Sequence, residues 1–192
     1  IIFVWAMLVP APLKGIANPD VSPNPAKAPW YFLGIQELLL HFHPVVAGVL
    51  IPGAGLTVLA LLPFLDISPE SVGVYFRSRR GLYFTFLAAG MSSSLTLLWL
   101  VLDEFVIDWS AWLPAWPSLV TTGFIPLAFL LLGLVGTDEG LQRMFKTNVE
   151  ERILFFFIFL LVSLTVLTLV GIFFRGPGME LYWPWELSAT HA

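Results

Sequence analysis

The chain has 192 residues, of which 58% are hydrophobic and only 11% are charged, and its net charge is −4. Soluble domains carry about 25% charged residues, so water is not the solvent for most of this surface. The sequence has no cysteine, which excludes disulfides, thiolate-bound iron–sulfur clusters and covalent c-type haem. The basic residues form no stripe that would bind nucleic acid. We therefore expect the lipid bilayer, and no nucleic acid, as a partner.

The N-terminal run Ile1–Leu13 is apolar, but thirteen helical residues reach only about 20 Å. A signal peptide would need a basic start and a cleavage site of small residues, and neither is present. We therefore expect residues 1–9 to be the end of a spanning helix whose beginning is missing.

The next segment, residues 10–44, is predicted as a loop that is rigid where it is rich in proline and amphipathic towards its end. From residue 28 to residue 65 the only formally charged residue is Glu37, which His41 and His43 follow closely. Partial burial is expected to raise the pKa of Glu37, which would suit a proton acceptor for the hydroxyl group of an apolar ligand. The alternative is a solvated carboxylate on a surface helix. The sequence identifies no third metal ligand for the two histidines. We therefore expect them to make polar contacts at the membrane interface rather than to bind a metal.

Four later windows contain no charged residue. Each has 19 to 22 residues, which matches the roughly 20 that cross a hydrocarbon core of about 30 Å. Backbone polar groups in lipid must be paired internally, so each window is predicted to be a helix. The expected fold is all-α, a single membrane domain (1–192) whose residues 45–174 form four spans: Val45–Leu65, Leu82–Leu102, Ser118–Gly136 and Ile153–Phe174.

Charges in the connections predict the orientation. The first connection carries three arginines and the third carries arginine and lysine, whereas the second, Asp103–Pro117, has three acidic residues and no basic one. By the positive-inside rule the two basic connections face the cytoplasm. The loop 10–44, the acidic connection and the tail 175–192 then share the outer side. Three tryptophans in the acidic connection suit the membrane interface.

The four windows also narrow the range of functions. None contains histidine, so this chain alone offers no bis-histidine haem site. None contains a charged residue that could form an ion or proton path, which argues against a standalone transporter.

The stretch Asn18–Gln36, followed by Val45–Asp66, resembles the C-terminal half of cytochrome b, which is a separate subunit IV in split cytochrome b/Rieske complexes. That family has a proline-rich lead-in to a Pro-Glu-Trp-Tyr-Phe-Leu motif in an outer loop. Here the motif position reads Ala28-Pro29-Trp30-Tyr31-Phe32-Leu33. The likeness covers the first half of the chain and fades through the second full span.

The resemblance implies a subunit of a respiratory oxidoreductase that passes electrons from quinol to cytochrome c or another acceptor, in a prokaryotic cytoplasmic (inner) membrane. The outer quinol-oxidation site would be shared with a haem-bearing N-terminal cytochrome b subunit and a Rieske-type iron–sulfur protein. A cytochrome c-type subunit is expected as a further partner. We expect a quinol of the menaquinone type. The b haems and the iron–sulfur centre would lie on partner chains, with none ligated by this chain.

One departure from the family concerns the motif glutamate, which aligns with Pro29, a residue without an acid or a backbone N–H. We therefore take Glu37 as the first candidate for the proton acceptor, with His41 or His43 next. Tyr31 would form a hydrogen bond with the quinone or with the docked Rieske domain. The predicted quinol-binding residues are Pro29, Trp30, Tyr31 and Phe32. The missing glutamate also leaves an alternative, a non-catalytic cytochrome b-like anchor in another respiratory complex.

Overall fold

The computed structural model describes Met7, Asp20, residues 24–64 and residues 79–189. Apart from Met7, the predicted helix end at residues 1–9 lies outside the described residues, as do most of the proline-rich lead-in and the end of the first span beyond Phe64. The regular structure of the described residues is helical, with one isolated antiparallel bridge between Arg175 and Leu181.

Within the described part of the chain, four helices are long and apolar enough to cross a membrane, and together they confirm the predicted all-α polytopic bundle. Three of them extend beyond their charge-free windows at one end or at both, whereas the first lies within its window. The third, for example, continues to Phe145 rather than ending at Gly136. Charged side chains can occupy such helix ends because their heads reach the polar interface. The observed spans are Val46–Phe64, Arg79–Phe105, Leu119–Phe145 and Val149–Phe173.

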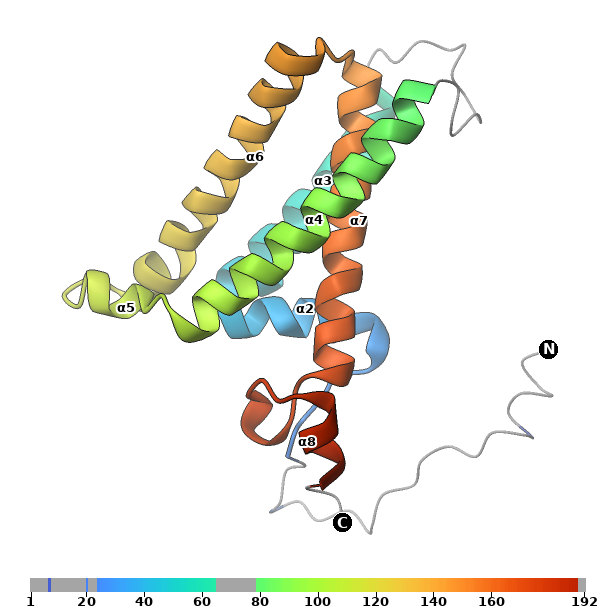
Figure 1. The fold of residues 1–192 in the computed structure, drawn as a ribbon. Coiled ribbons are helices and arrows are strands. Elements are labelled where there is room, and N and C mark those ends of the chain that lie inside the picture. The colour runs from blue at the N-terminus through green and yellow to red at the C-terminus, as the bar shows by residue number, and fades with distance from the viewer. Residues whose placement is uncertain (1–6, 8–19, 21–23, 65–78, 190–192) are drawn as a thin grey trace.

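Shorter helices precede, interrupt and follow these spans (Figure 1). In chain order the elements are α2 (Trp30–His41), η1 (Val46–Leu50), α3 (Ile51–Leu61), η2 (Leu62–Phe64), α4 (Arg79–Phe105), α5 (Trp109–Trp112), η4 (Leu119–Phe124), α6 (Ile125–Phe145), α7 (Val149–Phe173), η5 (Pro177–Met179) and α8 (Pro184–Ala189).

Helix α2 does not run with the spans but lies across them at one end of the bundle (Figure 1). The end of α4, the short α5 and the segment after α7 lie at the same end, which we call the α2 end. The opposite end, which we call the far end, holds the start of α4, the end of α6 and the start of α7. The three segments predicted to share one side of the membrane therefore meet at one end of the bundle.

Two of the spans begin with a π-helical turn, η1 before Pro52 and η4 before Pro126. Proline has no N–H to donate to the carbonyl four residues earlier, so the helical ladder slips by one residue. In η1 the N–H of Ile51 accordingly bonds to the carbonyl five residues back. The N–H of His43 donates to the carbonyl of Thr122 over 2.9 Å, which joins the entrances of the two spans at the α2 end.

Helices α4 and α7 cross and pack against one another through the bundle (Figure 1). Phe84 and Ala88 meet Phe155 in a buried apolar cluster towards the far end. Nearer the middle, the hydroxyl of Ser92 donates to the carbonyl of Phe159 over 2.7 Å and lies 2.8 Å from that of Ser163. Hydrogen bonds between helices in an apolar surrounding add stability and fix their register.

Candidate functional site

Helix α2 has one buried face and one exposed face. Leu33, Glu37 and His41 follow each other at four-residue spacing and are all buried, because residues four apart share a helix face. Two glycines allow the helix to approach α7 closely. A Cβ at Gly34 would lie 2.7 Å from a Leu164 side-chain carbon, and one at Gly171 would overlap the side chain of Leu33. Glu37 and His41 are therefore packed against the bundle rather than exposed to water.

The exposed start of α2 carries three consecutive aromatic residues. Trp30, Tyr31 and Phe32 are 71%, 59% and 54% exposed. Their ring centroids lie 5.8 Å apart for the first pair and 4.9 Å apart for the second. Pro29 is the N-cap residue, and its carbonyl accepts a hydrogen bond from the N–H of Phe32 over 2.9 Å. The residues predicted to line a quinol pocket therefore form one continuous surface outside the spans.

The segment that precedes α2, residues 24–28, is held in place by hydrogen bonds to side-chain amides. The Gln36 side chain accepts from the N–H of Ala28 over 2.6 Å and donates to the carbonyl of Ala26 over 2.7 Å. The Asn24 side chain accepts from the N–H of Gly178 over 2.6 Å. The lead-in is consequently fixed both to α2 and to the segment after α7.

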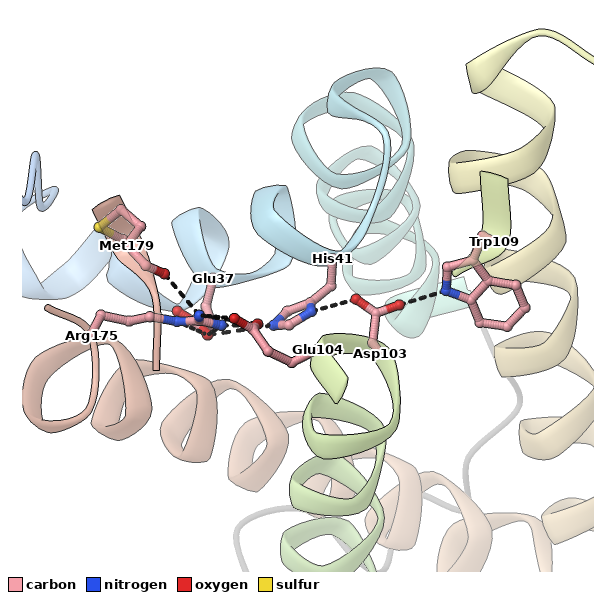
Figure 2. Close-up of polar contacts among 7 residues, drawn as sticks. All are labelled: Glu37, His41, Asp103, Glu104, Trp109, Arg175 and Met179. Carbon is pink, nitrogen blue, oxygen red and sulfur yellow. Dashed lines mark hydrogen bonds and ion pairs between the residues drawn. The ribbon is translucent and has the colours of Figure 1, made fainter. Parts of the chain in front are cut away.

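Arg175, the second residue after α7, is the centre of a buried polar cluster (Figure 2). Its guanidinium donates to Glu37 Oε1 through Nε (2.8 Å) and Nη2 (2.5 Å). Its Nη1 donates to both carboxylate oxygens of Glu104 over 3.1 Å and to the carbonyl of Met179 over 2.8 Å. The side chains of Arg175 and Glu37 are 1% and 0% exposed. One guanidinium thus joins α2, the end of α4 and the turn that follows α7.

His41 continues this cluster towards α5 (Figure 2). Its Nδ1 lies 2.6 Å from Asp103 Oδ2, and the indole N–H of Trp109 donates to Asp103 Oδ1 over 2.5 Å. On the other side of the ring, Nε2 lies 3.1 Å from Arg175 Nη2 and 3.5 Å from Glu37 Oε1. The imidazole therefore bridges two carboxylates that belong to different helices. Trp109 is buried, so it acts as a polar partner in addition to any role at the membrane interface.

The electrostatics of the cluster correct one prediction from the sequence. Burial raises the pKa of Glu37, but hydrogen bonds from His41 and Arg175 and their positive charges outweigh it, so that the pKa is lowered overall. The expectation that partial burial would leave this pKa raised is therefore wrong, because it did not include the contacts of Glu37 with Arg175 and His41. Burial lowers the pKa of His41, but hydrogen bonds and charges from Asp103 and Glu37 outweigh it and raise the pKa overall.

The other histidine of the loop, His43, has a different environment. It is partly buried, and its Nδ1 accepts from the N–H of Val45 over a long 3.3 Å. Among the described residues no group of three His, Cys, Asp or Glu side chains could hold a metal ion. The pair His41 and His43 thus divides into one histidine inside the polar cluster and one that bonds local backbone.

Four members of the cluster were missed by reasoning from the sequence: Asp103, Glu104, Trp109 and Arg175. Of these, Arg175 carried a usable signal. Arg175 is the only Arg or Lys after Arg152 and comes directly after the last apolar run. A lone cation at that depth needs a carboxylate partner, and the isolated Glu37 was available. Trp109 carried no such signal, since it is one of three similar tryptophans in its connection.

The fold and this cluster define a multi-pass helical membrane protein with a buried network of charges at one end. Residues 16–125, more than half of the chain, match the family model described as cytochrome b(C-terminal)/b6/petD. The chain belongs to this family, which confirms the resemblance found in the sequence. No solved structure matches the chain.

Membership of the family makes the protein a subunit of a cytochrome b-type complex of respiratory or photosynthetic electron transport. Haem and quinone take part in the chemistry of such complexes. The match includes α2, the polar residues Glu37, His41, Asp103 and Glu104, and the entrance of α6, whereas Arg175 lies beyond it.

Proposed function

We propose that this chain forms one wall of a quinol-oxidation site at the α2 end, within a quinol:cytochrome c (or other acceptor) oxidoreductase. Catalysis would be shared. The b haems and a Rieske-type iron–sulfur centre would be held by partner chains, and this chain would bind and orient the quinol, keep water from it and accept a proton from it. The family supports the class of complex, and the site itself is argued from the residues of α2.

The observation that carries the proposal is the exposure of three aromatic side chains on a helix that lies outside the spans. Exposed apolar residues on the spans are expected in contact with lipid. Trp30, Tyr31 and Phe32 instead lie at the entrance of α2, where their faces are open in this chain alone. Aromatic and apolar walls with a few placed polar groups are typical of sites for small apolar ligands. A haem-bearing N-terminal cytochrome b subunit would close the other side of the pocket.

The polar group proposed as proton acceptor is Glu37, which follows the aromatic residues on the same helix. Its Oε2 is buried and has no hydrogen-bond partner among the residues that the structure describes, while Oε1 is held by Arg175. A buried carboxylate oxygen without a partner is costly, and a quinol hydroxyl or a water molecule would satisfy it. The lowered pKa keeps Glu37 ionised, as an acceptor must be before the proton arrives.

Tyr31 and Pro29 complete the proposed pocket. Tyr31 is exposed beside both other rings, so its hydroxyl can hydrogen-bond a quinone carbonyl or the docked Rieske domain. Pro29 begins the helix without needing an N–H donor and presents an apolar ring where the family motif has glutamate. The proton would therefore be accepted two helical turns later, at Glu37.

Partners and orientation follow from the same proposal. The far end carries Arg79, Arg80, Arg143, Lys146 and Arg152. The positive-inside rule then directs the α2 end to the outer face of a prokaryotic cytoplasmic membrane. There a Rieske-type protein and a cytochrome c-type subunit would meet it. The quinol is proposed to be of the menaquinone type.

A second function is supported by one observation, the proline at the motif position. If Pro29 marks a site that has lost its chemistry, the chain would be a non-catalytic cytochrome b-like anchor, and the buried charges would only hold its segments together. The two functions differ in whether changes at α2 slow electron transfer without disturbing assembly.

The experiment uses the complex purified with its neighbouring chains. A reduced-minus-oxidised spectrum should contain b haem, and its absence would contradict the family-based proposal. In that complex, Tyr31→Phe and Glu37→Gln should each slow quinol-dependent reduction of the b haems while the haem content stays constant. Matched controls at the far end, Tyr83→Phe and Glu139→Gln, should leave the rate unchanged. Wild-type rates in both test variants would favour the anchor.

A further inference from the structure

Beyond the acceptor itself, the polar cluster extends away from Glu37 in a definite direction. The atoms follow in line from Glu37 through the two nitrogens of His41 to Asp103 and the indole of Trp109 (Figure 2). The exposed fraction of the side chain rises along this line, from 0% for Glu37 to 2% for His41 and 11% for Asp103. The line therefore leads from the buried carboxylate to the surface of the α2 end.

We propose that His41 and Asp103 form an exit relay, which carries the proton accepted by Glu37 to water at the α2 end. The inference rests on the proposed quinol chemistry and deepens it by naming the route that the proton takes. Glu37 touches the substrate in that account, whereas His41 and Asp103 act through it.

The step is a proton transfer in which no electron changes place within this chain. Two electrons of the quinol go to the redox centres of the partner chains. One of its two protons goes to Glu37, and the other goes to a base held by a partner chain. Protonation of Glu37 removes the negative charge to which Arg175 is bound. The carboxyl group can then turn its O–H towards His41 Nε2, which lies 3.5 Å from Glu37 Oε1 in the resting state. His41 gains this proton at Nε2 and gives up the proton on Nδ1 to Asp103, 2.6 Å away. Asp103 then releases a proton to water.

The neighbours of His41 favour this direction of transfer. Glu37 and its partner Arg175 lie on the Nε2 side of the imidazole, and Asp103 lies on the Nδ1 side. Glu104 is bound to Arg175 and so adds a second negative charge near the Nε2 side. Lys27 adds a positive charge that acts on Glu37. The pKa of Glu37 is lowered and that of His41 is raised, so the first transfer runs towards the stronger base. Arg175 Nη2 lies 3.1 Å from Nε2. In neutral His41 the guanidinium can donate to this nitrogen, which favours the Nδ1–H tautomer, the form that can accept a proton at Nε2.

The packing around Asp103 supports a fixed relay rather than a chance contact. Trp109 stacks on Trp99 with ring centroids 5.8 Å apart, and Trp99 stacks on Phe42 at 5.7 Å. These rings hold the indole that donates to Asp103 Oδ1, so that Oδ2 points at His41. Preorganised partners of this kind keep a relay within hydrogen-bond reach.

The test measures the pH profile of quinol-dependent b-haem reduction in the purified complex. In the wild type the rate should fall at low pH, because a protonated His41 cannot accept a further proton. Asp103→Asn should shift this fall to lower pH, since it removes the first partner that raises the pKa of His41, and it should lower the plateau at least tenfold. His41→Gln should lower the plateau and abolish the fall.

The matched control is Asp108→Asn. Asp108 lies in the same connection and caps α5 through the N–H groups of Ser110 and Ala111, without contacting His41. Asparagine caps a helix equally well, so this variant should keep the wild-type profile. A second readout needs no turnover: pH-dependent infrared difference spectra should show an imidazole signal that His41→Gln abolishes and Asp103→Asn moves to lower pH.

The outcomes separate the relay from the function on which it rests. If the wild-type complex reduces its haems with quinol but both variants retain the wild-type shape of the profile, the relay is wrong and the quinol site stands. If the wild-type complex shows no quinol-dependent reduction, both proposals fail together. If the complex that carries His41→Gln lacks haem, the relay is judged from Asp103→Asn alone, by whether the low-pH fall in rate moves to lower pH.

Discussion

The two ends of the bundle use the same kinds of charged residue in different ways. At the α2 end, the side chains of Arg175 and Glu37 are 1% and 0% exposed. At the far end, those of Arg143 and Glu139 are 79% and 54% exposed. The partners at the α2 end are 138 residues apart in the chain, whereas those at the far end are four apart on one helix. The buried pair at the α2 end is therefore assembled by the tertiary fold, whereas the most exposed pair at the far end is local to one helix.

The difference in burial has an energetic consequence. An exposed pair four residues apart on a helix contributes about 0.3–0.5 kcal/mol, because water and salt screen it. A buried pair is hardly screened, and removing one partner leaves an uncompensated charge that costs about 3–5 kcal/mol. Such a pair is weak evidence for stability as such, since an apolar pair of similar volume often does as well. Its retention at the α2 end suits a proton-handling function, which an apolar pair could not perform.

The largest effect is expected from Arg175→Gln, which leaves two carboxylates at the α2 end without their cation. We expect the free energy of unfolding in mixed detergent micelles to fall by about 3–5 kcal/mol. The double variant Glu37→Leu with Arg175→Leu should recover much of this loss, because the fully buried carboxylate is then removed and only Glu104, which is 24% exposed, lacks its cation. A loss below 1 kcal/mol in the single variant would mean that the pair is solvated in the membrane.

A second variant tests the close contact that carries α2. Gly171→Ala places a methyl group against Leu33 and 3.7 Å from Glu37 Oε2, so we expect a loss of about 1–3 kcal/mol from overpacking. Gly133→Ala is the matched control, because no atom of the described residues lies within 4 Å of its added Cβ. Equal stability of the two variants, measured by the same unfolding assay, would show that α2 does not pack on α7 as described.

The pH dependence of stability should come from the α2 end and be smaller. The lowered pKa of Glu37 adds stability above its ordinary pKa of 4.5, and this is lost as the pH falls through the lowered value. The raised pKa of His41 adds stability below its ordinary pKa of 6.5, and this is lost as the pH rises through the raised value. Both contributions are complete between those two ordinary values. Thermal unfolding at a series of pH values should therefore give a maximum there, and His41→Gln should remove the alkaline loss.

The smallest effect is expected at the far end, from Arg143→Gln. This arginine pairs with Glu139 on the exposed surface of α6, so the free energy of unfolding should change by less than about 0.5 kcal/mol. Salt should also abolish the difference. A loss comparable with that of Arg175→Gln would erase the distinction between the two ends.

The sequence predicted the spans and the exposed aromatic motif because both are local features. The length of each apolar run is set by the thickness of the bilayer, and Trp30–Phe32 is a contiguous motif. Helix ends were predicted less well, since charged residues such as Glu139 continue α6 past its apolar part. The pairing of Glu37 with Arg175 depends on how α2 and α7 meet, which no local pattern encodes. The sign of the pKa change at Glu37 followed from that pairing and was missed with it.

The most direct test of the account is to locate the quinone. A photoreactive azido-quinone, irradiated in membranes that contain the intact complex, should label the entrance of α2. Peptide mass spectrometry should then find the label on residues 28–41 of this chain, around Trp30–Phe32, and excess unlabelled quinol should prevent it. Labelling of the complex that leaves this segment untouched would contradict a quinol site at the α2 end.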